Sequence, residues 1–321
     1  MDTKEHKDCA IFTICTTSYL IGTEILLYSF LRQNRTFKGK IFVLLEKPDQ
    51  EIVHRLKIFP NIEFLHPSPP LIEKLESLAK LDPAMKPHLL YFYCFEMFKL
   101  EGFERIIYLD SDILCKKDIS ELFTDQIEFG ACGDRAYYDP ELARSVESFK
   151  MVNLGDVDNQ QLFDFPFNAG VLVVGRKLLN GKVYNDLLEL IRPSVFVNRW
   201  KRYADQIVLN LYFDQKVRHL SAKFNFNTTL QESWIMTKDS VGSKDAALIH
   251  YAGRKKPWHI LSLDSAEPFY LSEEWLREYR RYLLYRTFRQ REFNSLLKWF
   301  RTTVLHFQLM IKPDSEDRHR A

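Results

Sequence analysis

Short apolar segments alternate with segments of helical spacing through the first fifth of the chain, and this alternation restricts the possible folds more than any other feature. Strand-like and helix-like segments follow one another in the order 9–15, 21–33, 40–45, 50–59 and 62–65. Strands that alternate with helices predict a parallel, doubly wound α/β sheet with helices on its faces. The glycine-rich turn of NAD and FAD binders is missing, because Gly22 stands alone between the first strand and helix.

A further strand-like segment, residues 105–109, ends abruptly in Asp110 and Asp112. Ligands of an open α/β sheet bind at the carboxyl ends of its strands, so both carboxylates are expected at a binding site. Carboxylate oxygens suit Mg²⁺ or Mn²⁺, and a protein that supplies few ligands leaves positions for substrate phosphates. The pair therefore predicts a metal ion that chelates a nucleotide diphosphate. The alternative is a solvated turn, in which Asp-x-Asp recurs by chance.

Two later segments place polar residues at the start of a predicted element. Residues 165–174 form a strand-like run that begins with polar and small side chains, among them Asn168 and Ala169. Asp205 and Gln206 come directly before a run of helical spacing. Asp205 has two readings, because an acidic residue there also complements the dipole of a helix in its first turn.

A last strand-like segment, residues 246–250, ends in His250. Gly253 and a group of cations that includes Lys256 follow within six residues. A histidine followed by a glycine and cations suits a site for a metal and a diphosphate. A single histidine at a strand end is more often structural, so this segment alone does not decide between the two readings.

The composition is that of an ordinary globular chain, with 321 residues, 46% of them hydrophobic, and a formal net charge of +2. So small a net charge argues against a protein that binds polyanions over its whole surface. The five cysteines form no C-x-x-C pair, which favours a reducing compartment over a disulfide framework. The first residues have mixed charge without the apolar region of a signal peptide, and no window is apolar enough to span a bilayer. We therefore expect a cytoplasmic protein.

Taken together, four motifs resemble glycosyltransferase family 8, and they are Asp110-Ser111-Asp112, residues 167–170, Asp205-Gln206 and residues 250–258. This is a retaining family of GT-A fold that includes glycogenin, plant galactinol synthase and bacterial lipopolysaccharide α-glycosyltransferases. The resemblance covers roughly residues 9–260. It implies an α/β fold with a Rossmann-like, mixed but mostly parallel sheet flanked by helices. We expect this catalytic domain at residues 1–262, followed by a basic amphipathic helical extension at residues 263–321.

The resemblance also assigns roles to single positions of this chain. It implies three metal ligands, Asp110, Asp112 and His250, with Mn²⁺ as the usual ion and Mg²⁺ as the substitute. It implies that the UDP-sugar is bound by Thr16, Tyr19, Ser111, Asn168, Ala169, Gly253 and Lys256. The positions that face the reacting sugar are expected to be Asp205, Gln206 and Asp134.

The implied reaction moves a hexose, glucose or galactose, from a UDP-sugar to a saccharide, lipid-linked or on a cell-surface glycan. A divalent metal and Lys256 can stabilise the charge that develops on the leaving diphosphate. Retention of configuration requires either a protein nucleophile, for which Asp205 is the first candidate, or attack from the face of the leaving group. The residues leave both routes open, and we favour same-face attack with Gln206 at the reacting face.

One position departs from the family pattern. The helix before the Asp-x-Asp strand usually carries a basic residue that touches the diphosphate or the donor sugar, and here that place falls at or near Cys94. Arg135 or Lys99 can compensate for the missing charge. The alternative is a catalytically weak or inactive sugar-nucleotide-binding protein on the same fold. A metal-dependent nucleotidyltransferase is a third reading, but residues 16–22 lack the glycine-rich, basic loop that it needs.

The C-terminal tail is basic and amphipathic. Ser272 and two glutamates provide a helix start, and residues 275–312 carry nine lysines and arginines against two glutamates. Such a helix either docks on the enzyme through its apolar face or lies in an anionic membrane interface. The resemblance favours a peripheral protein on the inner face of a membrane, held by residues 275–312. No nucleic acid is expected, because no recognised binding module accompanies the charge.

Overall fold

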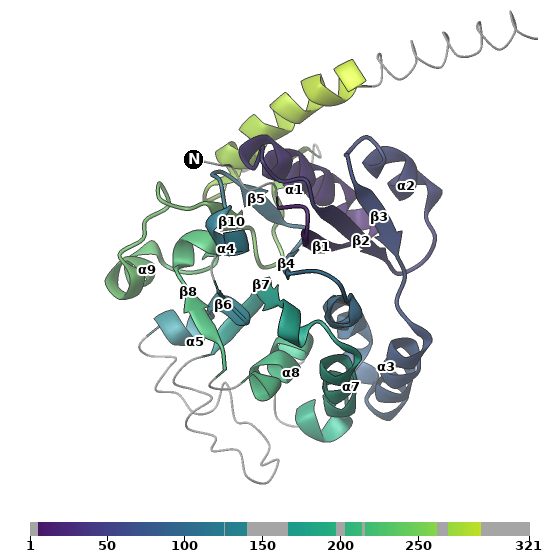
Figure 1. Cartoon of the computed structure of the whole chain (residues 1–321). Helices are drawn as coiled ribbons and strands as arrows, with labels where there is room; N and C mark the ends of the chain where they lie inside the picture. The colour runs from purple at the N-terminus through teal and green to yellow at the C-terminus, as the bar shows by residue number, and fades with distance from the viewer. Residues whose placement is uncertain are drawn as a thin grey trace, which may run out of the picture. The chain divides into compact units, whose positions relative to one another are not determined.

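The computed structural model describes residues 6–124, 126–139, 166–196, 203–213, 216–261 and 269–289. The chain forms two compact units, Met1–Trp275 and Leu276–Ala321. The first unit contains every strand of the described residues (Figure 1). The expected boundary after residue 262 stays a prediction about the extent of the catalytic domain.

A seven-stranded sheet in the order β3-β2-β1-β4-β7-β6-β8 forms the centre of the first unit. The pairs β1–β2, β2–β3, β1–β4 and β6–β8 are parallel, whereas β7 runs antiparallel to both of its neighbours. The sheet is therefore mixed but mostly parallel, as the resemblance implied. Its strands are β1 (Cys9–Cys15), β2 (Lys40–Leu45), β3 (Ile62–Leu65), β4 (Arg105–Leu109), β6 (Phe129–Gly133), β7 (Phe167–Gly175) and β8 (Arg218–Leu220).

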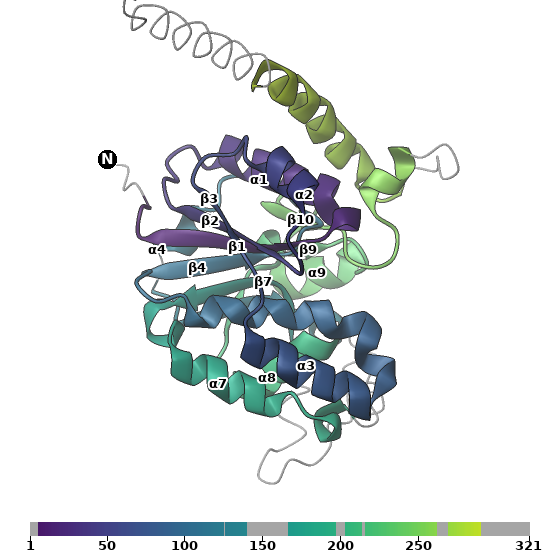
Figure 2. The ribbon, with the colours of Figure 1, turned by 90° about the vertical axis from the view of Figure 1, so that its right-hand side faces the viewer.

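Helices cover both faces of this sheet, and Figure 2 shows α1 and α2 on one side and α3, α7 and α8 on the other. The inner strands are apolar along nearly their whole length because both of their faces are buried. The helical segment η2 is 3-10 helical and packs against α3, α7 and α8. The elements of the two layers are α1 (Leu20–Gln33), α2 (Gln50–Leu56), α3 (Pro69–Leu81), η2 (Pro83–Lys99), α7 (Gly181–Leu190) and α8 (Ala204–Tyr212).

Local signals in the sequence set where several helices begin. The Asp49 carboxylate accepts hydrogen bonds from two backbone N–H groups in the first turn of α2, at 2.9 and 3.1 Å. Asn180 caps α7 in the same way, because its side-chain oxygen accepts a hydrogen bond of 3.0 Å from the backbone nitrogen of Val183. Proline at the first position of α3 is tolerated because that nitrogen has no partner within the helix.

A second, three-stranded sheet brings distant parts of the chain together at the site. Its order is β5-β10-β9, with β10 antiparallel to β5 and parallel to β9. In this register His250 lies opposite Ile113 on one side and Asn227 on the other. The three strands are β5 (Ile113–Cys115), β9 (Phe226–Asn227) and β10 (Leu248–His250).

The direction of β7 places its first residues at the functional edge of the large sheet. Because β7 is antiparallel to β4, its beginning lies beside the end of β4, and Val171 is opposite Leu109. The backbone nitrogen of Asp110 donates to the carbonyl oxygen of Gly170 at 2.9 Å. Polar residues at the start of β7 therefore meet the carboxylates at the end of β4, as the pattern of binding sites at strand ends requires.

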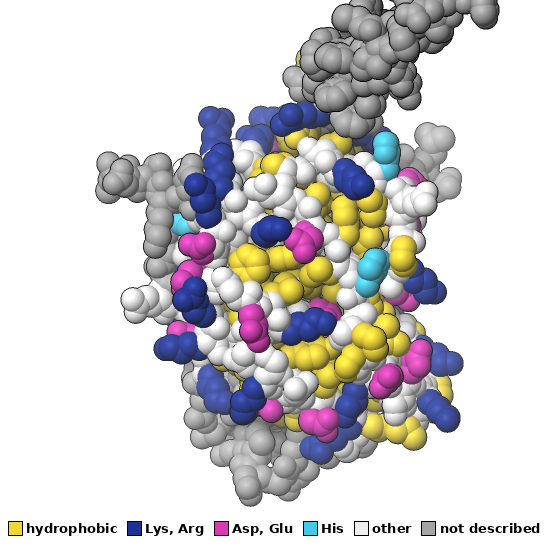
Figure 3. Space-filling view, turned by 45° about the vertical axis from the view of Figure 1, so that its right-hand side comes forward, with side chains coloured by type: hydrophobic (Ala, Val, Ile, Leu, Met, Phe, Trp, Pro, Cys, Tyr) yellow, Lys and Arg dark blue, Asp and Glu magenta, His cyan; other side chains and the backbone are white. Residues whose placement is uncertain are grey.

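Short elements complete the first unit. They are η1 (Thr17–Tyr19), α4 (Glu121–Thr124), α5 (Arg135–Tyr138), η5 (Arg176–Leu178), η6 (Pro193–Phe196), η8 (Ala222–Phe224), α9 (Glu232–Asp239) and η9 (Pro257–Leu261). All five cysteines are buried free thiols. On the face that Figure 3 shows, hydrophobic side chains gather in the middle, with cationic and acidic side chains around them.

Residues 272–289 are helical, and those from 276 onward belong to the second unit. Glu278 and Arg281 form an ion pair of 2.7 Å one helical turn apart. Leu284 and Phe288 are 64% and 63% exposed. None of the helices in the described part of the chain combines the length and apolarity that crossing a membrane requires. The rest of the expected tail helix, residues 290–312, lies outside the described residues, as does the whole of the segment 140–161.

Candidate active site

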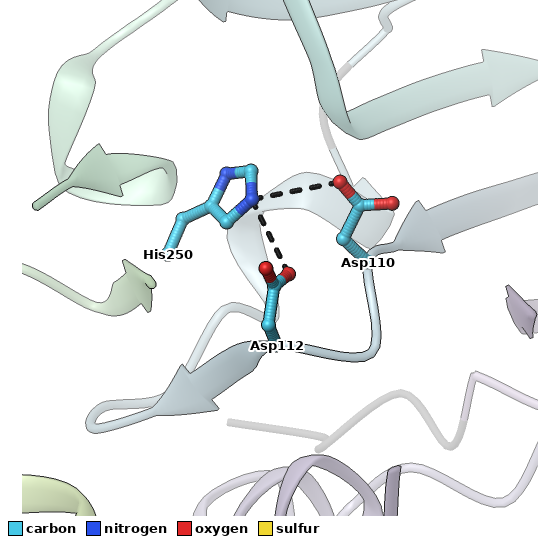
Figure 4. A group of neighbouring side chains, drawn as sticks. All are labelled: Asp110, Asp112 and His250. Atoms are coloured by element: carbon cyan, nitrogen blue, oxygen red, sulfur yellow. Dashed lines mark ion pairs between the residues drawn. The ribbon is translucent and has the colours of Figure 1, made fainter. Parts of the chain in front are cut away.

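Three side chains from separate segments converge at the edge where the two sheets meet (Figure 4). Asp110 follows β4, Asp112 precedes β5, and His250 ends β10. The Nε2 atom of His250 lies 3.5 Å from an oxygen of Asp110 and 3.3 Å from an oxygen of Asp112. One potential ligand atom from each residue lies within 4.8 Å of the other two. Two carboxylates and an imidazole at these separations can reach a single divalent ion.

The backbone at the start of β7 approaches this cluster so closely that it leaves no room for a side chain. A Cβ atom at position 170 would lie 2.4 Å from Cε1 of His250 and 2.9 Å from Oδ2 of Asp110. Any residue other than glycine would therefore displace two of the three side chains. The small residues that the sequence shows at the start of β7 thus have a steric reason, because a close approach of backbone to a site needs glycine.

Asn225, which the sequence reasoning missed, contacts the same histidine at Nδ1, the ring nitrogen that faces away from the two carboxylates. Its side-chain oxygen lies 2.9 Å from Nδ1 of His250, and only 4% of the residue is exposed. A metal-binding histidine usually donates its second ring N–H to such an acceptor, which fixes the ring. Asn225 lies between η8 and β9, flanked by Phe224 and Phe226, and nothing in its sequence surroundings marks it as a site residue.

Charges inside the cluster shift the pKa values of its members. Burial and the charge of Asp112 raise the pKa of Asp110 above its usual range. Burial alone would also raise the pKa of Asp112, but His250 and Lys256 outweigh it and hold that pKa well below its usual value. Burial disfavours the charged form of His250, yet the carboxylates of Asp112 and Asp110 raise its pKa above normal. The site thus holds one firmly ionised carboxylate beside a group that readily becomes cationic.

Lys256 contributes a buried ammonium group to the cluster. Its Nζ atom donates to Oδ2 of Asp112 and, at 3.0 Å, to the carbonyl oxygen of Tyr251. The same atom lies 5.4 Å from the centre of the Tyr19 ring. Burial lowers the pKa of Lys256, but the charge of Asp112 dominates and raises it. Tyr19 and Lys256, both expected to bind the donor, therefore lie beside Asp112, an expected metal ligand.

The residues expected near the nucleoside are half-buried or buried rather than exposed to solvent. The ring of Tyr19 lies edge-on to the ring of Trp258, 5.3 Å between centres, and Thr16 is half-buried beside it in the sequence. Ser111 is 6% exposed, and its hydroxyl donates to the carbonyl oxygen of Ile14. The hydroxyl of Thr23 donates to Ser111 at 3.1 Å. The side chain of Ser111 thus points into the protein, and its contact with ribose stays a prediction.

Two glycines near the site have conformational reasons for their positions. Gly253 has a φ of +89°, in the left-handed region that favours glycine. A Cβ atom at Gly22 would lie 2.5 Å from the carbonyl oxygen of Ser111 and 2.7 Å from the Trp258 ring. The single glycine after the first strand therefore permits α1 to pack closely on the loop between Asp110 and Asp112.

The residues expected to face the sugar form one hydrogen-bonded group. The amide of Gln206 donates to Asp134 at 2.8 Å, and the amide of Asn168 donates to Gln206 at 3.2 Å. The backbone nitrogen of Ala169 donates to the same Gln206 oxygen at 3.3 Å. Asn225 donates to Asn168 at 2.8 Å, which joins this group to the histidine of the cluster.

Asp205 lies in the first turn of α8, as its position before the apolar run indicated. The thiol of Cys94 donates to it at 3.8 Å, so the residue at the departure from the family pattern does meet this carboxylate. Burial and the charge of Asp110 raise the pKa of Asp205 to about 7. The two cations proposed as substitutes are engaged elsewhere, Lys99 with Glu96 at 2.6 Å and Arg135 with Asp139 at 3.5 Å.

Comparisons with known proteins identify the family and the fold of this chain. The chain is 24% identical over 255 residues to lipopolysaccharide 1,2-glucosyltransferase of Escherichia coli, and the match covers 75% of this chain and 70% of that protein. It is 29% identical over 168 residues to lipopolysaccharide 1,3-galactosyltransferase of Salmonella typhimurium, covering 49% of this chain and 44% of that protein. It is 25% identical over 257 residues to glycogenin of Neurospora crassa, and this match covers 78% of this chain and 31% of glycogenin.

Among solved structures, the galactosyltransferase LgtC in complex with donor and acceptor sugar analogues superposes with a TM-score of 0.63 at 16% sequence identity. The match covers 85% of this chain and 95% of LgtC, and it establishes the GT-A fold. The family model for glycosyl transferase family 8 matches residues 10–262, which contain every residue of the site described above. This chain is therefore a member of glycosyl transferase family 8.

Proposed function

We propose that the protein is a metal-dependent, retaining hexosyltransferase that moves glucose or galactose from a UDP-sugar to a saccharide. The single observation that carries the proposal is the convergence of Asp110, Asp112 and His250, with Lys256 beside them. Breaking the bond between a sugar and a diphosphate requires positive charge at the leaving group. The two carboxylates and the imidazole would supply this charge by binding a divalent ion, and Lys256 would add its ammonium group. The names of the related lipopolysaccharide enzymes support a lipid-linked or cell-surface glycan as the acceptor.

Asp110, Asp112 and His250 are proposed to hold the ion, with Mn²⁺ preferred and Mg²⁺ as the alternative. Carboxylates suit both ions, and the imidazole favours a transition metal over Mg²⁺. When bound, the ion supplies positive charge to the leaving diphosphate. Lys256 adds an ammonium group that the surrounding protein keeps charged and desolvated.

The remaining residues are proposed to bind and orient the donor. Tyr19 offers a ring for the base at the edge of the cluster, and Thr16, Ser111 and the backbone of Gly253 complete the nucleotide side. On the other side, Asn168, Ala169, Gln206 and Asp134 present amide and carboxylate groups for the hydroxyls of the hexose. Their mutual hydrogen bonds keep these groups in place before a sugar arrives, which is the preorganisation that a binding site needs.

The environment of Asp205 favours same-face attack over a double displacement. In the metal-free protein, burial and the charge of Asp110 raise the pKa of Asp205 to about 7, so that a large part of this carboxyl is protonated at neutral pH, and a protonated carboxyl is a weak nucleophile. Gln206, at the start of the same helix, is held by Asp134 and Asn168 toward the sugar side. We therefore assign Gln206 to the reacting face and Asp205 to the recognition of the sugar.

A specific observation also favours the second candidate function, a sugar-nucleotide-binding protein with weak or no catalysis. The side chain that meets Asp205 is the thiol of Cys94, where the family usually has a cation. Without that cation, stabilisation of the leaving group depends on Lys256 and the metal alone. Release of UDP from UDP-glucose and UDP-galactose separates the candidates, because the binding protein retains the donor without cleaving it.

The C-terminal extension, residues 263–321, is proposed to attach the protein to an anionic membrane surface through residues 275–312. The described part of the second unit offers Arg277, Arg280 and Arg286 along with the exposed Leu284 and Phe288. Basic and apolar side chains on one helix suit an interface that is anionic outside and apolar inside. The expected partners are thus the donor, a saccharide acceptor and a membrane, and not a nucleic acid.

A thermal-shift screen of UDP-sugars with and without Mn²⁺ tests the proposal directly. A ligand that binds only the folded state raises the melting temperature by mass action. We expect stabilisation by UDP-glucose or UDP-galactose that is larger with Mn²⁺ than with EDTA, and Mn²⁺-dependent release of UDP. Absence of any shift with all UDP-sugars, with and without Mn²⁺, contradicts the proposal.

A further inference from the structure

The side-chain amide of Asn225 is the only described side chain that bonds both to the histidine of the acidic cluster and to the group expected to face the sugar. Asn225 is 4% exposed, so water does not compete for these bonds. An asparagine amide has one accepting end and one donating end, and the two ends are not interchangeable once a neighbour is fixed. The orientation of this amide therefore has consequences on both sides.

Backbone N–H groups fix that orientation, because a backbone nitrogen can only donate. The nitrogen of Gly170 donates to the Asn168 side chain at 2.9 Å, so the atom of Asn168 at this position is its oxygen. Asn225 contacts the same oxygen at 2.8 Å and must present its NH₂ group to it. The other end of Asn225, its carbonyl oxygen, consequently faces Nδ1 of His250 at 2.9 Å.

An oxygen in this position can only accept, so Nδ1 of His250 carries a hydrogen. The lone pair of the neutral ring is then on Nε2, the atom that faces Asp110 and Asp112 at 3.5 and 3.3 Å. This is the arrangement that a histidine needs in order to bind a metal through Nε2. The opposite tautomer would leave two acceptors, Nδ1 and the Asn225 oxygen, facing each other in a buried place.

The same reasoning extends to the sugar side. The backbone nitrogen of Ala169 donates to Gln206 at 3.3 Å, so that atom is the oxygen of Gln206. Asn168 then donates to this oxygen, and the NH₂ group of Gln206 is left to donate to Asp134 at 2.8 Å. All bonds of the chain run in one sense, from His250 through Asn225, Asn168 and Gln206 to Asp134.

We infer that Asn225 is a positioning residue that holds His250 in the metal-binding tautomer and ties its orientation to that of the sugar-facing amides. This inference rests on the function proposed above, since it assumes a metal at the cluster and a sugar at Asn168 and Gln206. It assigns Asn225 no contact with the reacting atoms. Removing its oxygen weakens the metal site, whereas removing its NH₂ group loosens the sugar site.

Two substitutions separate these effects. Asn225→Leu keeps the size but removes both bonds, and we expect Mn²⁺ affinity, measured by calorimetry or electron paramagnetic resonance, to fall by about 10- to 100-fold. Asn225→Asp keeps an oxygen for His250 but places a second acceptor against Asn168. We expect it to retain Mn²⁺ affinity within about threefold of the wild type, while KM for the UDP-sugar rises.

Asn34→Leu is the matched control, because Asn34 is also buried and its amide bonds to Phe30 and Ile119 in the core. We expect it to lower the melting temperature without changing Mn²⁺ affinity. If Asn225→Asp lost as much Mn²⁺ affinity as Asn225→Leu, or left both Mn²⁺ affinity and KM unchanged, the inference would be overturned while the proposed function stood. Lack of Mn²⁺ binding by the wild-type protein would overturn both. Should Asn225→Leu not fold, the comparison of Asn225→Asp with the wild type still decides.

Discussion

Lys256 and Asp112 form a buried ion pair, in which Nζ of the lysine donates to Oδ2 of the aspartate. Lys256 is 5% exposed and Asp112 is 7% exposed, so each charge depends on the other for the solvation that water no longer provides. The aspartate is also a proposed metal ligand and the lysine a proposed diphosphate ligand. In the free protein, the lysine therefore supplies part of the positive charge that an ion would bring.

Lys256→Met is expected to destabilise the metal-free protein by about 3 kcal/mol, because it removes one of the two groups that stabilise the buried carboxylate of Asp112. Added Mn²⁺ restores positive charge at Asp112, so it should raise the melting temperature of this variant more than that of the wild type. Thermal unfolding in EDTA and in Mn²⁺ measures both effects. Lys40→Met is the control, since the Lys40–Glu63 pair is about half exposed on both sides and contributes at most about 1 kcal/mol. Equal losses in the two variants would contradict the expectation.

Asp112→Ala and His250→Ala are each expected to abolish the Mn²⁺-dependent release of UDP from the donor. Each removes one of the three groups that converge within reach of a single ion. The measurement is the rate of UDP release as a function of Mn²⁺ concentration. Asp118→Ala is the matched control, because Asp118 is an exposed carboxylate that accepts hydrogen bonds from the backbone nitrogen and the hydroxyl of Ser120, away from the cluster. Unchanged turnover in either site variant would refute the metal site.

Gly170→Ala is expected to weaken Mn²⁺ binding and to destabilise the fold by about 1–3 kcal/mol, as overpacking in a buried place does. The added methyl group would lie 2.4 Å from the His250 ring and 2.9 Å from the Asp110 carboxylate. Calorimetric titration with Mn²⁺ and thermal unfolding report the two effects. Gly181→Ala, at a helical position with no atom within 4 Å of the new Cβ, should leave both quantities close to the wild type. A wild-type Mn²⁺ affinity in Gly170→Ala would contradict the proposal that the ion binds between His250 and Asp110.

Asp205 is expected to make stability depend on pH below neutrality. Burial and the charge of Asp110 raise its pKa to about 7 in the folded protein, whereas an aspartate in an unfolded chain titrates near pH 4. The folded state therefore holds this proton more tightly, and its contribution to stability is lost as pH rises from about 4 to about 7. In the metal-free protein, Asp205→Asn should become more stable relative to the wild type over this range. The measurement is the melting temperature of both proteins from pH 5 to 8. A difference in melting temperature that does not change with pH would contradict the assigned pKa.

The sequence predicted the first strands with the bounds that the structure has, residues 9–15, 40–45 and 62–65, and it predicted the carboxylates at the end of β4. These features are local, because a short apolar run rich in β-branched and aromatic residues and bounded by polar turns is typical of a buried strand. The family resemblance added the histidine, the lysine and the sugar-facing amides. It also supplied the mixed character of the sheet, which the alternation of strands and helices by itself would have made fully parallel.

Only the tertiary structure decided which groups meet and in what orientation. The antiparallel direction of β7 brings Gly170 against Asp110, and the register of β10 with β5 brings His250 to Asp112. The role of Asn225 depends on the donor and acceptor ends of three amides, which two backbone nitrogens orient from β7. Residue types along the chain set which side chains can donate, accept or carry charge. Which of them become partners depends on strand pairing between distant segments, and no local pattern encodes that pairing.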